Sequence, residues 1–323
     1  MILQTLLLLI GIVLLYLGSE WMVRGASVLA LSFFIRPIII GVTVVAFATS
    51  APELLVSLIA AVKGSSGVSL GNILGSNVAN IGLVLGASAL VKPQTVDRGL
   101  MKRELPFMLG VSLLFWWTCL DGAIGRLDGV ILLSALGAFL AMSIATARTG
   151  NNPQPGSLPQ RRLKATSWQV FLMLIGLVGL MVGANTIVNS AIFIAQRLGL
   201  SEIFIGLSIV AVGTSLPELA TSVVAGAKGE SDISIGNVVG SNVFNICMVI
   251  GTVGLFNPMT VDMGAVQIKF ATMIGISLLL FVFCRTGYRV NRLEGACLFL
   301  DLFCSSSCPT GSDKMRHHPP INR

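Results

Sequence analysis

The sequence predicts an all-α integral membrane protein of about ten transmembrane helices, arranged as two inverted five-helix repeats. Three observations predict this fold: an apolar composition, a duplicated block, and an odd number of helices in each copy. Of the 323 residues, 54% are hydrophobic and 11% are charged, against about 25% charged in a typical soluble domain. This composition excludes an ordinary water-soluble globule.

The duplicated block covers residues 41–97 and 206–262, which align without a gap at a constant offset of 165. Of the 57 aligned positions, 29 are identical. Many of the apolar residues differ between the copies, whereas these polar residues are kept: Thr49/Thr214, Ser50/Ser215, Glu53/Glu218, Ser57/Ser222, Ser76/Ser241, Asn77/Asn242 and Asn80/Asn245. A carboxylate kept twice inside an apolar run indicates a membrane transporter with two half-sites.

Each half is expected to contain one long apolar helix, the two helices of the block, and two further apolar helices, since a span needs roughly 20 apolar residues. In the first half these helices are predicted at about 2–30, 40–62, 68–91, 101–120 and 127–147. In the second half they are predicted at about 168–196, 205–227, 233–256, 265–284 and from 291 onward. Because five is odd, the second copy must enter the membrane in the opposite orientation.

The domain organisation follows from these helices. We predict a first repeat (1–147, block 41–97), a cytoplasmic linker (148–167), a second repeat (168–303, block 206–262) and an atypical polar tail (304–323). The last apolar run breaks at Asp301 after roughly eleven residues, which is short for a span. A truncated or frameshifted final helix is favoured over a short helix followed by an extramembrane tail.

The basic residues indicate topology, because they lie between the predicted spans rather than in one patch. With the N-terminus outside, twelve Lys and Arg fall in cytoplasmic loops or the linker and four in outer loops. The first apolar run lacks a basic flank and a cleavage pattern, so it is interpreted as a retained helix. We therefore expect a multi-pass protein of the cell (inner) membrane that contacts the lipid bilayer and ions, without nucleic acid or an obligate protein partner.

The first helix of the block carries the polar groups that matter most. Thr49, Glu53 and Ser57 are spaced by four residues and lie on one helix face. Pro52 has no amide hydrogen, so the Ala48 carbonyl loses its helical partner. In lipid a freed carbonyl must be satisfied, and a bound cation is one candidate. The second copy repeats this pattern.

The second helix of the block adds amides and hydroxyls at the same spacing, beside glycines that let helices approach closely. These residues are Asn72, Ser76 and Asn80 in one copy and Asn237, Ser241 and Asn245 in the other. The whole set offers hard oxygen ligands, which select Ca²⁺, Mg²⁺, Na⁺ or Mn²⁺. Two glutamates can balance one divalent ion, while the same oxygens could serve monovalent ions or protons. Mutually exclusive occupancy would give antiport.

Other functions are weighed against this one. A glutamate near mid-span costs roughly 2.5 to 3.5 kcal/mol on insertion scales, so two equivalent ones favour function over structure. A channel stays open as an alternative. An intramembrane hydrolase using Ser50 or Ser215 is a remote alternative, because no histidine or lysine base lies in register. The chain is therefore not expected to be an enzyme.

Two motifs resemble a known family. Gly-Thr-Ser-Leu-Pro-Glu at 213–218 and its variant at 48–53, with Gly-Asn-x-x-Gly-Ser-Asn-x-x-Asn at 71–80 and 236–245, are similar to the repeats of the cation/Ca²⁺ exchanger (CaCA) superfamily. The resemblance is greatest to bacterial and archaeal inner-membrane sodium/calcium antiporters, and it covers the chain up to about residue 300.

This resemblance implies a sodium/calcium exchanger-like fold with four ion sites and a sliding movement of helices one and six. It implies a secondary active antiporter that exchanges Ca²⁺ for Na⁺ by alternating access, with exchange of Ca²⁺ or another divalent cation for H⁺ as the alternative. The transported ions are substrates, and no cofactor is implied.

The resemblance also assigns the ion ligands. It implies that the central Ca²⁺ ligands are Glu53 and Glu218, together with the carbonyls of Thr49 and Thr214. It implies that the flanking Na⁺ sites use Ser50, Ser215, Ser76, Ser241 and the carbonyls of Ala46 and Ala211. Asn80 and Asn245 would face the middle of the site. Related exchangers often carry aspartate at the second asparagine position, whereas both are Asn here. The site then has two negative charges rather than three, which leaves stoichiometry, K⁺ dependence and the coupling ion open.

Overall fold

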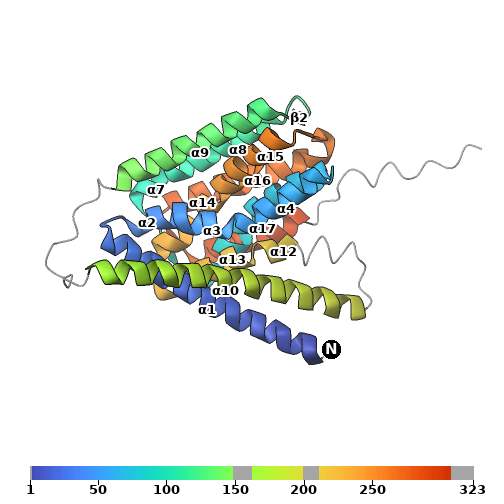
Figure 1. Ribbon diagram of the computed structural model, residues 1–323. Coiled ribbons are helices and arrows are strands. Elements are labelled where there is room, and N and C mark those ends of the chain that lie inside the picture. The colour runs from blue at the N-terminus through green and yellow to red at the C-terminus, as the bar shows by residue number, and fades with distance from the viewer. Residues whose placement is uncertain (1, 148–161, 199–210, 307–323) are drawn as a thin grey trace, which may run out of the picture.

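The computed structural model describes residues 2–147, 162–198 and 211–306, and these residues form a helical bundle (Figure 1). Six of the described helices are long and apolar enough to cross a membrane, or seven if one bent pair counts as a span. The prediction of a helical multi-pass membrane protein is confirmed, while the number of about ten spans stays a prediction.

The elements of the first half are α1 (Ile2–Ser32), α2 (Pro37–Ile40), η1 (Gly41–Val45), α3 (Ala46–Thr49), α4 (Ala51–Val62), α5 (Ser66–Ala79), η2 (Asn80–Leu85), α6 (Gly86–Val91), β1 (Gln94–Thr95), α7 (Arg98–Lys102), α8 (Glu104–Thr118), β2 (Ala123–Ile124) and α9 (Arg126–Ala147), where η denotes a π-helix. Each predicted helix of this half has a counterpart, but the one at 40–62 is divided into four segments.

The elements of the second half are α10 (Arg162–Arg197), α12 (Ala211–Thr214), α13 (Leu216–Lys228), α14 (Ser231–Phe244), η4 (Asn245–Ile250), α15 (Gly251–Phe256), β3 (Met259–Thr260), α16 (Met263–Arg285), β4 (Arg289–Val290) and α17 (Arg292–Ser306). The start of the helix predicted at 205–227, most of the predicted linker and nearly all of the polar tail lie outside the described residues. The domain boundaries therefore stay predictions.

The first long helices of the two halves, α1 and α10, pack along each other at one edge of the bundle (Figure 1). Glycines make this contact possible. A Cβ on Gly18 would lie 2.7 Å from the Gly176 carbonyl oxygen, and a Cβ on Gly176 would lie 2.7 Å from that of Gly18. Backbone meets backbone here, so larger residues cannot be accommodated.

Two short strand pairs join the halves at their loops. β1 pairs with β4 and β2 pairs with β3, both antiparallel, with Gln94 opposite Val290 and Ala123 opposite Thr260. Each pair joins one loop of the first half to one loop of the second. An all-helical prediction missed the strands, because two residues give no periodicity to detect.

The interior is formed mainly by the second helix of each block, and this helix is more deeply buried in the second copy than in the first. In the most apolar window of Ser231–Phe256, 89% of residues are buried, against 72% for Ser66–Val91. The final helix α17 has 15 residues where α9 has 22. It is nevertheless packed, since Gly295 lies against the backbone of Gly86 and Leu298 is fully buried.

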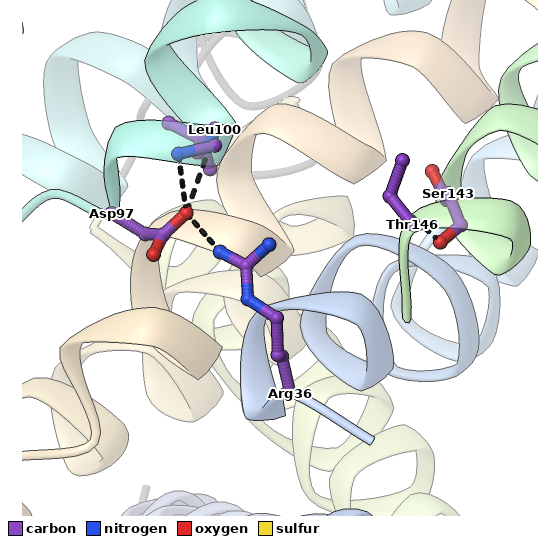
Figure 2. A network of polar contacts seen from close by, with 6 residues as sticks. Arg36, Asp97, Leu100, Ser143 and Thr146 are labelled. Atoms are coloured by element: carbon purple, nitrogen blue, oxygen red, sulfur yellow. Dashed lines mark hydrogen bonds and ion pairs between the residues drawn. The ribbon is translucent and has the colours of Figure 1, made fainter. Parts of the chain in front are cut away.

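One ion pair holds the start of the bent helix to the loop after α6. Asp97 caps α7 by accepting hydrogen bonds from the amides of Gly99 (2.6 Å) and Leu100 (3.2 Å), and it also pairs with Arg36 just before α2 (Figure 2). Burial alone would raise the pKa of Asp97, but the Arg36 guanidinium and these amides hold the pKa below its ordinary value.

Candidate functional site

The helix that carries Glu53 breaks just before this residue. α3 ends at Thr49, Ser50 leaves helical geometry at φ −80° and ψ 0°, and α4 begins at Ala51 after a bend of 42°. Pro52 explains the break, because it lacks the amide hydrogen needed to continue the helix. The break sets Glu53 in the first turn of α4, where the amide ends of the helix favour negative charge.

The second copy breaks in the same way. Ser215 adopts φ −89° and ψ 6°, α13 begins at Leu216, and Pro217 occupies its first turn together with Glu218. The two carboxylates therefore stand at equivalent helix starts, one from each half of the molecule.

The partner helices of the block change their hydrogen-bond pattern at equivalent asparagines. α5 gives way to the π-helix η2 at Asn80, and α14 gives way to η4 at Asn245. These positions are related by the offset of 165. π-Helical segments inside α-helices are frequently found at functional sites. A third one, η1, faces α14 from the helix that leads to Glu53.

The central carboxylates are buried and lack a basic partner. Glu53 and Glu218 are both 0% exposed. The ion pairs among the described residues join Arg36 to Asp97 and Lys228 to Glu20. A pair of buried carboxylates without a neutralising cation is costly in a bilayer.

Hydroxyl groups link the carboxylate helices to their neighbours. Ser76 Oγ donates to Glu53 Oε1 at 3.5 Å within the first half. Thr49 Oγ1 donates to Asn237 Oδ1 at 3.1 Å and lies 3.3 Å from Ser241 Oγ, so it connects the first half to the second. The Ala46 carbonyl accepts from the Ser50 amide at 3.0 Å and from Thr49 Oγ1 at 3.4 Å.

Several oxygens of the predicted ion ligands are buried without a hydrogen-bond partner in the described part of the chain. These atoms are Ser50 Oγ, Glu53 Oε2, Asn80 Oδ1, Ser215 Oγ, both carboxylate oxygens of Glu218, and Asn245 Oδ1. Buried polar atoms are normally satisfied, so a set of orphaned oxygens from both repeats fits a hard cation.

The remaining polar residues of the two blocks differ in burial and in contacts. Thr214 is half-buried where its twin Thr49 is fully buried, and Ala211 begins α12, with its side chain outside the described residues. Asn72 and Asn237 donate to Ser57 and Ser222, both at 3.0 Å, so these amides brace the two helices of each block.

Sequence reasoning missed the partners of the two central asparagines. Asn80 Nδ2 donates to Asn242 Oδ1 and Asn245 Nδ2 donates to Asn77 Oδ1, both at 3.1 Å. Each bond crosses from one repeat to the other. The signal was present, because Asn77 and Asn242 are kept in both copies, but periodicity alone does not show which amide meets which.

Comparisons with known proteins agree along most of the chain. A family model described as sodium/calcium exchanger protein matches residues 3–145 and 168–305. The chain is 33% identical over 332 residues to the sodium/calcium exchanger MaX1 of Methanosarcina acetivorans, covering 91% of this chain and 95% of the relative. It is 38% identical over 290 residues to the inner membrane protein YrbG of Escherichia coli, covering 88% and 89%.

A solved structure extends the likeness to three dimensions. The sodium-calcium exchanger NCX_Mj, soaked with 2.5 mM Na⁺ and 0.1 mM Ca²⁺, superposes with a TM-score of 0.83 at 33% identity. The match covers 96% of this chain and 99% of that one.

Proposed function

The chain belongs to the sodium/calcium exchanger protein family, and from this premise we propose that it moves Ca²⁺ out of the cytoplasm in exchange for Na⁺. It is a multi-pass membrane antiporter of that family rather than an enzyme. The observation that carries the proposal is the pair of buried glutamates, Glu53 and Glu218, which have no basic partner among the described residues. The transported cation supplies the missing positive charge.

The proposed ligands are those that the family resemblance assigns, and the side chains of Glu53, Glu218, Ser50 and Ser215 contribute orphaned oxygens. Glu53 and Glu218 bind Ca²⁺ at the centre with the carbonyls of Thr49 and Thr214. The flanking Na⁺ positions use Ser50, Ser215, Ser76, Ser241 and the carbonyls of Ala46 and Ala211, while Asn80 and Asn245 face the middle. The orphaned oxygens of Ser50, Ser215, Asn80 and Asn245 support these roles.

The charge balance explains why exchange is coupled. Two carboxylates neutralise one Ca²⁺ ion, so the loaded site is close to electrically neutral. The empty site would carry two unscreened negative charges in a medium of low dielectric, where their repulsion is strong. The protein with an empty site therefore changes conformation unfavourably. Another cation must bind before the site can be exposed again to the opposite side of the membrane.

The direction of transport rests on the proposed topology. With the N-terminus outside, twelve basic residues fall on the cytoplasmic side and four on the outer side. The breaks at Ser50 and Ser215 are buried, at 0% and 1% exposure. We place the protein in the cytoplasmic membrane, where an inward Na⁺ gradient drives Ca²⁺ extrusion.

Everted membrane vesicles test the proposal directly. Vesicles loaded with Na⁺ should take up ⁴⁵Ca²⁺ when diluted into Na⁺-free buffer, and Glu53→Gln or Glu218→Gln should abolish this uptake. Glu20→Gln is the matched control, since Glu20 lies in α1 and pairs with Lys228 at the surface. Uptake that persists in both central variants would overturn the proposal.

A gradient swap identifies the coupling ion. The same vesicles are given a pH gradient in place of the Na⁺ gradient, without any other change. Na⁺-dependent uptake supports the proposed exchange. Uptake that depends on the pH gradient and not on Na⁺ would instead indicate Ca²⁺/H⁺ exchange, in which the two carboxylates carry protons.

A further inference from the structure

Two methionines outside the duplicated block contact the asparagines of the site. We propose that Met108 and Met273 are positioning residues that fix the orientation of two chains of amides, so that the oxygens of Asn80 and Asn245 point at the transported cation. The inference rests on the proposed function, because it concerns how tightly that site binds Ca²⁺.

The first chain begins on α8. Asn242 Nδ2 donates to Met108 Sδ at 3.6 Å, and Asn242 Oδ1 accepts from Asn80 Nδ2 at 3.1 Å. The amide nitrogen of Asn80 is thereby occupied, and its oxygen Oδ1 is buried without a hydrogen-bond partner in the described residues. A methionine and an asparagine of the first repeat thus hold one asparagine of the second.

The second chain begins on α16 and repeats this arrangement. Asn77 Nδ2 donates to Met273 Sδ at 3.5 Å, and Asn77 Oδ1 accepts from Asn245 Nδ2 at 3.1 Å. Asn245 Oδ1 is likewise buried without a partner among the described side chains. All three members of one chain map onto those of the other at the offset of 165, although the methionines lie beyond the aligned block.

The chemistry of the methionine gives each chain its direction. An amide has a donor end and an acceptor end of nearly equal size, so packing alone cannot choose between its two orientations. A thioether sulfur accepts a hydrogen bond but cannot donate one. It therefore draws the NH₂ group of the first asparagine, whose oxygen then draws the NH₂ group of the second. The last oxygen is left facing the site.

Burial makes this choice matter. Met108 and Met273 are 0% exposed, and Asn77 and Asn242 are 1% and 2% exposed. Bulk solvent therefore does not reach these side chains to satisfy a reversed amide. A reversed chain would present the NH₂ group of Asn80 or Asn245 to the ion, and a donor hydrogen repels a cation. Leucine could fill the volume of either methionine, but it would remove the acceptor.

A double-mutant experiment on the purified full-length protein in detergent tests the assignment. Ca²⁺ titration calorimetry on Met108→Leu should show a Kd raised roughly 3- to 10-fold, which corresponds to the loss of one buried hydrogen bond. In the Asn80→Ala background Met108→Leu should have no further effect, because no oxygen is left to orient. In the Asn245→Ala background its full effect should persist.

Controls separate orientation from packing. Met142→Leu is the matched substitution on α9, where the side chain packs against the same hydrophobic core, and its Kd should equal that of the wild type. Met273→Leu should mirror Met108→Leu, with its effect lost in Asn245→Ala and kept in Asn80→Ala. The mirrored set gives a second, independent measurement if one variant folds poorly.

The outcomes distinguish this inference from the proposed function. An unchanged Kd in both methionine variants overturns the inference, as does an equal loss in every background, which would indicate a packing role. If Glu53→Gln abolishes Ca²⁺ binding in these same experiments, the proposed site survives either result. If Glu53→Gln and Glu218→Gln still bind Ca²⁺ normally, the site assignment and the inference fail together.

Discussion

The two repeats match closely at the centre and diverge towards the membrane surfaces. At the centre, the carboxylates, the helix breaks and the onset of the π-helices coincide at the offset of 165. Towards the surfaces, the buried Glu104 on α8 corresponds to the exposed Lys269 on α16. The residues proposed to bind the ion are the ones kept in both repeats, whereas the peripheral residues differ between them.

Even the centre is not perfectly symmetric. Glu53 accepts a hydrogen bond from Ser76, while neither oxygen of Glu218 has a partner in the described portion of the chain. Ser241, the twin of Ser76, contacts Thr49 instead. Because the two serines are equivalent residues, this difference is one of conformation between the repeats.

The largest expected effect concerns the α1–α10 contact, where the two halves are equivalent. Gly18→Leu and Gly176→Leu should each destabilise the fold by more than about 3 kcal/mol, because the added atoms meet backbone that cannot move aside. Size-exclusion profiles and thermal unfolding in detergent measure this loss. Gly137→Leu on α9 is the control, since none of the described residues lies within 4 Å of a Cβ there. A folded Gly18→Leu protein with normal stability would contradict the close packing.

An intermediate effect should separate the two central serines. Ser76→Ala removes a hydrogen bond to Glu53 and should change the KM for Ca²⁺ roughly 2- to 10-fold. Ser241→Ala should change it less, because Thr49 keeps its bond to Asn237. Initial rates of ⁴⁵Ca²⁺ uptake at varied Ca²⁺ give both values. Equal effects would show that the repeats are interchangeable at this position.

The smallest effect concerns the Arg36–Asp97 pair of the first half. Because the folded-state pKa of Asp97 lies below its ordinary value of 3.8, the pair stabilises the protein above that pH, and this contribution is lost as pH falls through the lowered pKa. Arg36→Ala should therefore cost about 1 kcal/mol at neutral pH, since the pair is partly exposed.

Thermal unfolding of Arg36→Ala and wild type as a function of pH measures this contribution. The two curves should converge in acid. Asp262→Asn is the comparison in the second half, where Asp262 caps α16 through the Gly264 amide at 3.0 Å. A difference in thermal stability between wild type and Arg36→Ala that stays the same at every pH would contradict the electrostatic explanation.

Much of the fold and of the candidate site could be predicted from the sequence, because duplication marks functional positions. Glu53, Glu218, Asn80 and Asn245 were identified as polar residues kept in both copies of an apolar block. The prolines also predicted the helix breaks. These features leave a local signal, either a residue type that lipid disfavours or one that a helix cannot contain.

Other features leave no local signal. The π-helices begin at asparagines that an α-helix could equally accept. The cross-repeat amide bonds depend on how the two halves pack, which four-residue spacing within one helix does not determine. In the sequence, Met108 and Met273 resemble the other apolar residues of a membrane helix, and only their offset of 165 distinguishes them.

The cross-repeat amide pairs have a consequence for how the protein is made. Asn80 finds its partner on Asn242, and Thr49 finds its partners on Asn237 and Ser241, so the first repeat cannot satisfy its own polar groups. At about 5 to 20 residues per second, the ribosome needs roughly 10 to 30 s to deliver the second repeat. During that interval the polar groups of the first half that pair across the repeats have no partner from the second half.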